Sequence, residues 1–199
     1  KLIIIACNTA SSVAYNSLCA QFDIPIFNVV DPSVVYSSKI SKSRMVGIIG
    51  TRTTIYSEAY RKSFLDIKSD CSIIETACPL FVPLIEEGWS ETPVAEEIAE
   101  TYLSKFNDSN IDVLILGCTH YPIMGKTIKK VLDRNISLVY SGSTVGNSVS
   151  AYLENNNCEN TCNNNNTKFY VTDFPQKFDE LGSRFLGRNL NYIEHISII

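Results

Sequence analysis

One short pattern occurs twice in the chain, at residues 1–10 and again at residues 112–121. Each copy has one charged residue, four large aliphatic residues, a small residue, a cysteine and two polar residues. A short apolar run of this kind favours a buried strand over a helix. The small residues Ala6 and Gly117 would let the chain turn without crowding. Cys7 and Cys118 should therefore each follow the carboxyl end of a strand.

The two cysteines are the first candidate functional residues. Open α/β sheets place their ligand sites at the carboxyl ends of the strands. A free cysteine is often only a small buried apolar residue, but packing alone does not require the same cysteine-plus-polar ending twice. The repeat therefore predicts two half-sites that face each other across a cleft.

Further apolar runs predict strands at 24–30, 44–49, 71–76, 137–140, 169–172 and 192–198. Helices are expected between them. Thr9 is the expected N-cap of a helix over 10–20 with Val13 on its apolar side. One helix should run from Ile55 to about Leu65, and another from Pro175 to Leu186. Thr92 and Pro93 open another helix, with Val94 inward. This alternation predicts an α/β fold with mostly parallel sheets.

The order of the elements also predicts a domain division. If Asp31 and Gly142 mark chain crossings, the chain forms two pseudosymmetric α/β lobes. The first would comprise residues 1–31 plus 142–199, and the second residues 32–141. The active site would then lie in the cleft between the lobes.

Composition excludes several classes of function. The net charge is −4 and the 17 Lys and Arg residues form no cluster, so neither a nucleic-acid surface nor an anionic membrane surface is indicated. No apolar run reaches transmembrane length. Seven scattered cysteines, an odd number, indicate a reducing compartment, the cytoplasm. Cys158 and Cys162 lie in the asparagine-rich stretch 155–167, where we expect a flexible polar loop rather than a metal site.

Several stretches together resemble the glutamate racemase family of the aspartate/glutamate racemase superfamily. They are residues 6–10 (Ala-Cys-Asn-Thr-Ala), 117–122 (Gly-Cys-Thr-His-Tyr-Pro), 48–51 with Thr54, 77–88 and 169–173. The resemblance implies two α/β domains with the active site between them. It implies interconversion of L- and D-glutamate without cofactor or metal, supplying D-glutamate for bacterial peptidoglycan.

The resemblance also implies the roles of particular residues. Cys7 would remove the α-proton from D-glutamate, and Cys118 would remove it from L-glutamate. Glu86 and His120 would assist the second cysteine. The substrate's polar groups would be bound by Asn8, Thr9, Thr119 and His120.

The chemistry suits a pair of thiols. Inverting a carbon without a cofactor needs a base on one face and an acid on the other. A thiol and a thiolate can exchange these roles once the pKa falls from about 8.5 toward neutrality. Proton transfer from both faces of one carbon predicts sulfur atoms about 6–8 Å apart.

The chain departs from the family pattern in two ways. The family has a segment before the first strand, with an Asp-Ser turn and a Tyr-Gly loop, so we expect these 199 residues alone to be a poor enzyme. Tyr140 also stands where the family usually has Asp.

Three other functions are open to this sequence. The first is aspartate racemisation, and the second is a catalytically silent α/β binding module. The third is a hydrolase using Cys118 and His120, which lacks a third orienting group and leaves Cys7 without a role. A homodimer is left open.

Overall fold

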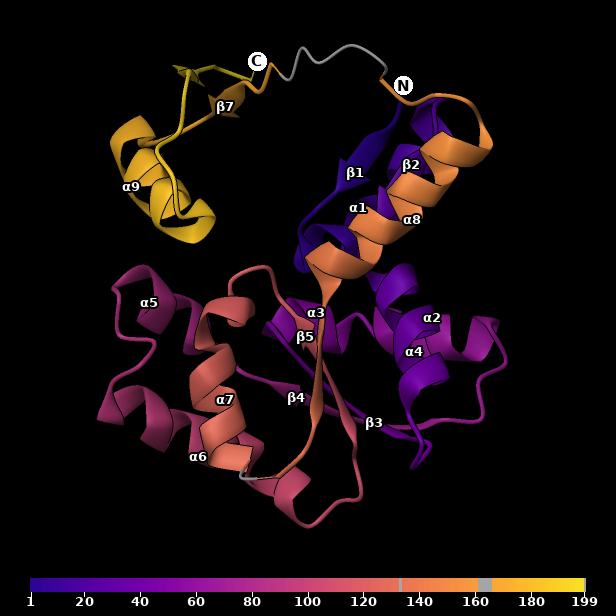
Figure 1. Ribbon diagram of the computed structural model, residues 1–199, viewed down its shortest axis with the longest axis vertical. Coiled ribbons are helices and arrows are strands. Elements are labelled where there is room, and N and C mark those ends of the chain that lie inside the picture. The colour runs from indigo at the N-terminus through magenta and orange to yellow at the C-terminus, as the bar shows by residue number, and fades with distance from the viewer. Residues whose placement is uncertain (133, 161–165, 199) are drawn as a thin grey trace. The chain divides into compact units, whose positions relative to one another are not determined.

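The computed structural model describes residues 1–132, 134–160 and 166–198 (Figure 1). These residues form two compact units, Lys1–Cys158 and Glu159–Ile199. Within the described residues, every pair of neighbouring strands is parallel. The predicted α/β fold with parallel sheets is thus confirmed, whereas the division into lobes 1–31 plus 142–199 and 32–141 stays a prediction.

The main sheet of the first unit has four strands in the order β4-β3-β5-β6. Its strands are β3 (Met45–Gly50), β4 (Ser72–Ala77), β5 (Val113–Gly117) and β6 (Ser137–Tyr140). Central β5 is buried along its whole length, which explains why its sequence is apolar without alternation. All four strands lie close to the residue ranges predicted from their apolar runs.

Helices cover both faces of this sheet (Figure 1). One face carries α2 (Val30–Ile40) and α4 (Ala59–Asp66), and the other carries α6 (Pro93–Asn107) and α7 (Gly125–Leu132). Alternate strand residues form the core beneath α2 and α4, because successive side chains point to opposite faces. That core contains Val34, Val46, Ile48, Tyr60, Phe64, Val113, Ile115 and Val139.

Asp112, the charged residue that begins the second copy of the repeat, binds the loop at residues 41–43 through hydrogen bonds. Its carboxylate accepts hydrogen bonds from the Ser41 hydroxyl, from the backbone N–H groups of Lys42 and Ser43, and from the Ser43 hydroxyl. Burial works to raise the pKa of this carboxyl, but the hydrogen bonds outweigh it and lower the pKa to about 2. The charge at the start of this copy is therefore structural.

Position 117 requires a glycine for a reason other than the predicted turn. It is still part of β5 and lies opposite Gly50 of β3. A Cβ atom at Gly117 would lie 2.7 Å from the backbone oxygen of Ile49 and 3.2 Å from the ring of Tyr60. The close approach of β3 therefore requires glycine here.

We expect Gly117→Ala to lower the free energy of unfolding by about 1–3 kcal/mol, because the added methyl group meets a backbone atom that cannot move aside. Urea unfolding measures the change. Gly146→Ala is the matched control, since a Cβ at Gly146 meets nothing within 4 Å and alanine favours the interior of α8 (Ser141–Asn155). A Gly117→Ala variant as stable as its parent would contradict this account.

The first copy of the repeat differs from the expectation of a buried strand. Its strand β1 (Ile3–Ile5) pairs with β2 (Ile26–Asn28). Of the three residues of β1, only Ile5 is buried, and Ile4 is 40% exposed. In α1 (Asn8–Gln21) the buried residues are Asn8 and Ser11, and Val13 is exposed. The predicted apolar side of this helix is therefore wrong, because the side that packs inward is polar.

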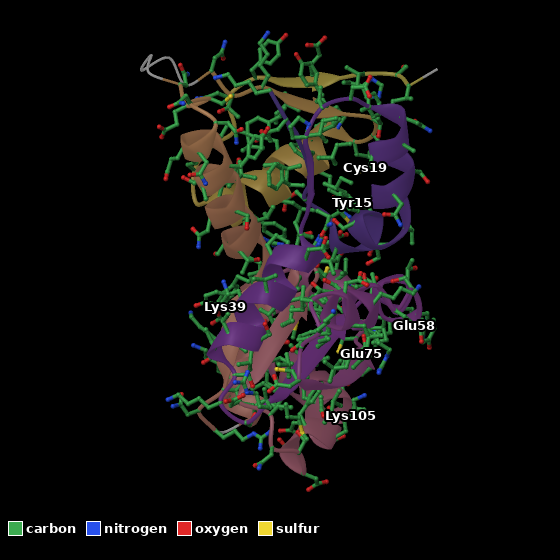
Figure 2. All side chains as sticks on the ribbon, turned by 90° about the vertical axis from the view of Figure 1, so that its right-hand side faces the viewer. Tyr15, Cys19, Lys39, Glu58, Glu75 and Lys105 are labelled. Carbon is green, nitrogen blue, oxygen red and sulfur yellow. The ribbon has the colours of Figure 1, made fainter. Side chains whose placement is uncertain are left out.

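Two local predictions also fail at helix boundaries. Cys7, not Thr9, is the N-cap of α1, because the extended backbone already ends at Cys7. The single helix predicted from Ile55 is instead α3 (Arg52–Tyr56) followed by α4. The break lies at Glu58, whose φ of 57° places it in the left-handed region (Figure 2).

The helix predicted from Thr92 is confirmed. The Thr92 side chain accepts a hydrogen bond from the Ala95 N–H, and Pro93 is the first residue of α6. Val94 is exposed rather than inward, because the buried side of α6 consists of Ala95, Ala99, Leu103 and Phe106. The unit also contains α5 (Phe81–Glu86) and the 3₁₀ helix η1 (Tyr121–Met124).

The second unit is small. It pairs β7 (Phe169–Val171) with β8 (Ile193–His195) and contains α9 (Pro175–Leu186), whose predicted limits are confirmed. Cys162 and the rest of 161–165 lie outside the described residues, so the proposed loop stays a prediction. Among the described residues, no helix is long and apolar enough to cross a membrane, and no three His, Cys, Asp or Glu residues gather as a metal site.

Candidate active site

Cys7 lies where β1 passes into α1. It is exposed, and its sulfur accepts a hydrogen bond from the Ala10 N–H at 3.5 Å. The first turn of a helix offers unpaired N–H groups and the positive end of the helix dipole. A bound carboxylate is therefore favoured at this position.

Cys118 follows directly after β5 and is only 7% exposed. Burial raises the pKa of its thiol to about 11, and the charge of Cys7 adds to the rise, against backbone hydrogen bonds from His120 and Tyr121 that lower it. A thiolate at Cys7 therefore disfavours a thiolate at Cys118. Near neutral pH, Cys118 holds its proton.

His120 links Cys118 to a carboxylate. Its Nδ1 atom is 3.9 Å from the Cys118 sulfur, and its Nε2 atom is 3.4 Å from Oε1 of Glu86, the last residue of α5. A carboxylate on one ring nitrogen fixes the orientation of the other nitrogen. The structure thus supplies the third orienting group that the hydrolase alternative lacked in sequence, although that alternative still gives Cys7 no role.

Asn8 is buried beneath the first half-site. Its Oδ1 atom accepts a hydrogen bond from the Tyr60 hydroxyl at 2.6 Å, and its Nδ2 atom donates to the Ser141 hydroxyl at 3.0 Å. The amide is 1% exposed. One Nδ2 hydrogen and one Oδ1 lone pair are left for a ligand, so its predicted role in substrate binding stays open.

Thr9 belongs to a triangle of hydroxyl groups. Its oxygen lies 2.9 Å from that of Thr51 and 3.2 Å from that of Thr54, and the latter two are 3.0 Å apart. These contacts bring the first cysteine motif onto the Gly-Thr turn after β3. Thr119, between Cys118 and His120, is exposed. The triangle and Thr119 are therefore groups that can hydrogen-bond to a polar ligand.

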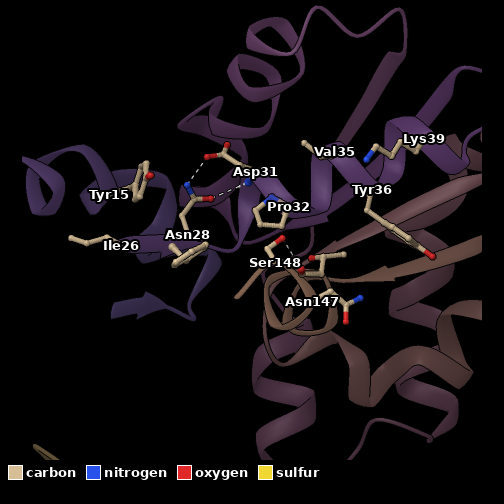
Figure 3. A pocket seen from close by; sticks show the side chains of 12 residues that line it. Tyr15, Ile26, Asn28, Asp31, Pro32, Val35, Tyr36, Lys39, Asn147 and Ser148 are labelled. Carbon is tan, nitrogen blue, oxygen red and sulfur yellow. Dashed lines mark hydrogen bonds between the residues drawn. The ribbon is translucent and has the colours of Figure 1, made fainter. Parts of the chain in front are cut away.

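A separate cavity of about 480 Å³ lies among α1, β2, α2 and α8 (Figure 3). Tyr15, Asp31 and Lys39 are among the residues that line it, and a hydrogen bond from Asn28 to Asp31 crosses its wall. None of the seven predicted site residues lines this cavity. It is thus distinct from the cysteine site.

The sequence did not reveal Tyr60 and Ser141, whose hydroxyl groups form hydrogen bonds with the Asn8 side chain. Neither residue lies in a recognisable motif, since Tyr60 is one aromatic residue within a helix and Ser141 one serine at a strand end. Their role depends on contacts across 52 and 133 positions of sequence, respectively. A single sequence carries no signal for such contacts.

The fold and the paired strand-end cysteines define the class of protein. The sequence profile of Asp/Glu/Hydantoin racemases matches residues 1–145, and the chain belongs to this family.

Within the family, the chain is similar to glutamate racemases. The one from Geobacter metallireducens is 37% identical over 199 residues, covering 100% of this chain and 74% of that relative. The crystal structure of the Francisella tularensis enzyme, in complex with D-glutamate, superposes with a TM-score of 0.92 at 37% identity over 99% of this chain and 73% of that one. A Bacillus anthracis glutamate racemase structure matches with a TM-score of 0.92 at 27% identity, over 100% of this chain and 74% of that one.

Proposed function

We propose that the protein interconverts L- and D-glutamate without a cofactor, with Cys7 and Cys118 as the two acid–base groups. The observation that carries the proposal is the pair of strand-end cysteines, with Cys7 acting electrostatically on Cys118, in a chain similar to glutamate racemases.

The reaction from D- to L-glutamate starts with Cys7 as thiolate and Cys118 as thiol. Cys7 takes the α-proton from one face of the substrate, and Cys118 gives its own proton to the opposite face. One C–H bond breaks and another forms, so that the configuration inverts and Cys118 is left as the thiolate. The raised pKa of Cys118 supports its role as the acid in this direction.

The reverse reaction needs Cys118 as a base, and burial works against that role. His120 lies near the sulfur and can hold the proton that Cys118 gives up, while Glu86 stabilises the imidazolium that results. The N-terminus of α1 and the hydroxyl groups of Thr9 and Thr119 are suited to the substrate carboxylates. Asn8 and His120 would complete the binding groups.

We place the reaction in the cytoplasm, with the D-glutamate going to peptidoglycan synthesis. A homodimer is the assembly we would test first, by light scattering of the purified protein. The substrate is a small molecule, and neither nucleic acid nor membrane has a part in the proposed reaction.

The test is racemisation of L-glutamate by the full-length protein in deuterium oxide. We expect D-glutamate that carries deuterium at the α-carbon, because the returning proton comes from a thiol that exchanges with solvent. Chiral chromatography and mass spectrometry measure both, and added pyridoxal phosphate should not change the rate. Faster turnover of aspartate would make the protein an aspartate racemase, and turnover of neither substrate would favour a binding module.

A further inference from the structure

Tyr60 contacts both cysteine motifs. It lies on α4, is fully buried, and donates a hydrogen bond to Oδ1 of Asn8, the residue after Cys7. Its ring also lies against Gly117, the residue before Cys118, since a Cβ there would be 3.2 Å from ring atom Cε2. A single side chain therefore lies beneath both half-sites.

Tyr60 is itself held rigidly. Its ring belongs to the core cluster that includes Ile48, Phe64 and Ile115. Burial raises the pKa of its phenol, and the charge of Cys118 adds to this rise. The phenol consequently stays a neutral hydrogen-bond donor at every pH at which the protein would work.

The Asn8 amide has a second hydrogen-bond partner besides Tyr60. Asn8 donates to the hydroxyl of Ser141, the first residue of α8, and all three side chains are buried. Asn8 begins α1, directly after the N-cap Cys7. A shift of the Asn8 amide would therefore move the backbone that carries the Cys7 sulfur.

We propose that Tyr60 is a positioning residue that sets the placement of Cys7 relative to Cys118 through Asn8. The inference rests on the proposed racemisation, because only a reaction at both faces of one carbon depends on that placement. Tyr60 is buried, so it acts on the proton transfers through the placement of Cys7 and not by contact with the substrate. A displacement of about 1 Å in a reacting group costs about 100-fold in rate.

The test is Tyr60→Phe, which keeps the ring and removes the hydroxyl. We expect kcat to fall about 10- to 100-fold in both directions, a larger factor than any rise in KM that follows from moving Asn8. The deuterium isotope effect on kcat, measured with α-deuterated glutamate, should rise because proton transfer becomes slower relative to the other steps. A variant that only folded poorly would lower the amount of active enzyme and leave this ratio unchanged.

Ser141→Ala provides an independent variant, since it removes the other hydrogen bond of the same amide. It should lower kcat in the same way, and the double variant should lose less than the product of the two single losses, because both act through Asn8. Tyr56→Phe, on the exposed side of α3, is the matched control and should keep the parental kcat.

Several results would overturn the inference. They are a parental kcat in Tyr60→Phe, an unchanged isotope effect, or fully multiplicative losses in the double variant. Failure of the parent protein to racemise glutamate would instead defeat the proposed function, so the two failures are distinguishable.

Discussion

Replacing Cys7 by serine, or Cys118 by serine, should each lower kcat for glutamate racemisation by about 10³-fold or more, since each removes one of two proton-transfer groups. A serine hydroxyl does not ionise in the range where a thiol does, so it is a poor base. Neither remaining cysteine can replace the other, because each serves one face of the carbon. Racemisation in both directions should therefore fail in both variants.

The two variants should still fold. Serine is a preferred N-cap, so Cys7→Ser keeps the first turn of α1. At Cys118 the serine hydroxyl is smaller than the thiol and fits the same space. Thermal unfolding followed by circular dichroism checks that both variants stay folded.

Cys19→Ser is the control for the loss of a thiol. Cys19 is exposed on α1 (Figure 2), the helix that Cys7 caps, and its variant should racemise at the parental rate. If Cys7→Ser or Cys118→Ser retains a rate near that of Cys19→Ser, the two-base mechanism is wrong.

The strands of the main sheet were predictable because each is a short, mostly apolar run of the chain. Residues 44–49, 71–76 and 137–140 were all predicted as strands, and β3, β4 and β6 lie within one residue of these limits. The limits of α9 were predictable as well, because proline is favoured at the first position of a helix and glycine just after its end. Pro175 is the first residue of α9, and Gly187, with a φ of 63°, follows its last residue.

Local rules failed where tertiary contacts decide the outcome. Thr9 has the side chain of an N-cap, but its hydroxyl is engaged by Thr51 and Thr54, and the backbone leaves Cys7 as the cap. The break at Glu58 was not predictable, because glutamate has no preference for a positive φ.

The candidate site was predictable in its residues but not in its framework. The cysteine motifs and His120 can be recognised in the sequence, because the proposed proton transfers need thiol and imidazole side chains. Tyr60 and Ser141 do not, because a buried hydrogen bond between distant segments has no local pattern. The groups that hold a site in place are therefore harder to find than the groups that react.

Replacing His120 by asparagine should lower kcat from L- to D-glutamate by about 100-fold and lower kcat in the opposite direction less. In the proposed mechanism Cys118 is the base only in the first direction, and burial raises its pKa to about 11. The imidazole at 3.9 Å is the group that can take up its proton. In the other direction Cys118 already holds the proton that it must give, so the loss of His120 matters less.

Thermodynamics makes this asymmetry checkable. The two enantiomers have equal free energies, so kcat/KM must stay equal in both directions. KM for L-glutamate must therefore fall relative to KM for D-glutamate by the same factor as the two kcat values. Initial rates from each pure enantiomer, followed by circular dichroism, give all four constants.

The pH dependence separates proton uptake from simple positioning. In His120→Asn the missing kcat from L-glutamate should return as pH rises toward the pKa of Cys118, since hydroxide then replaces the imidazole as proton acceptor. Glu86→Gln, which keeps the imidazole but removes the carboxylate beside Nε2, should show a smaller loss with the same asymmetry. Equal losses of kcat in both directions, unchanged by pH, would mean that His120 only orients the substrate and that Cys118 loses its proton by another route.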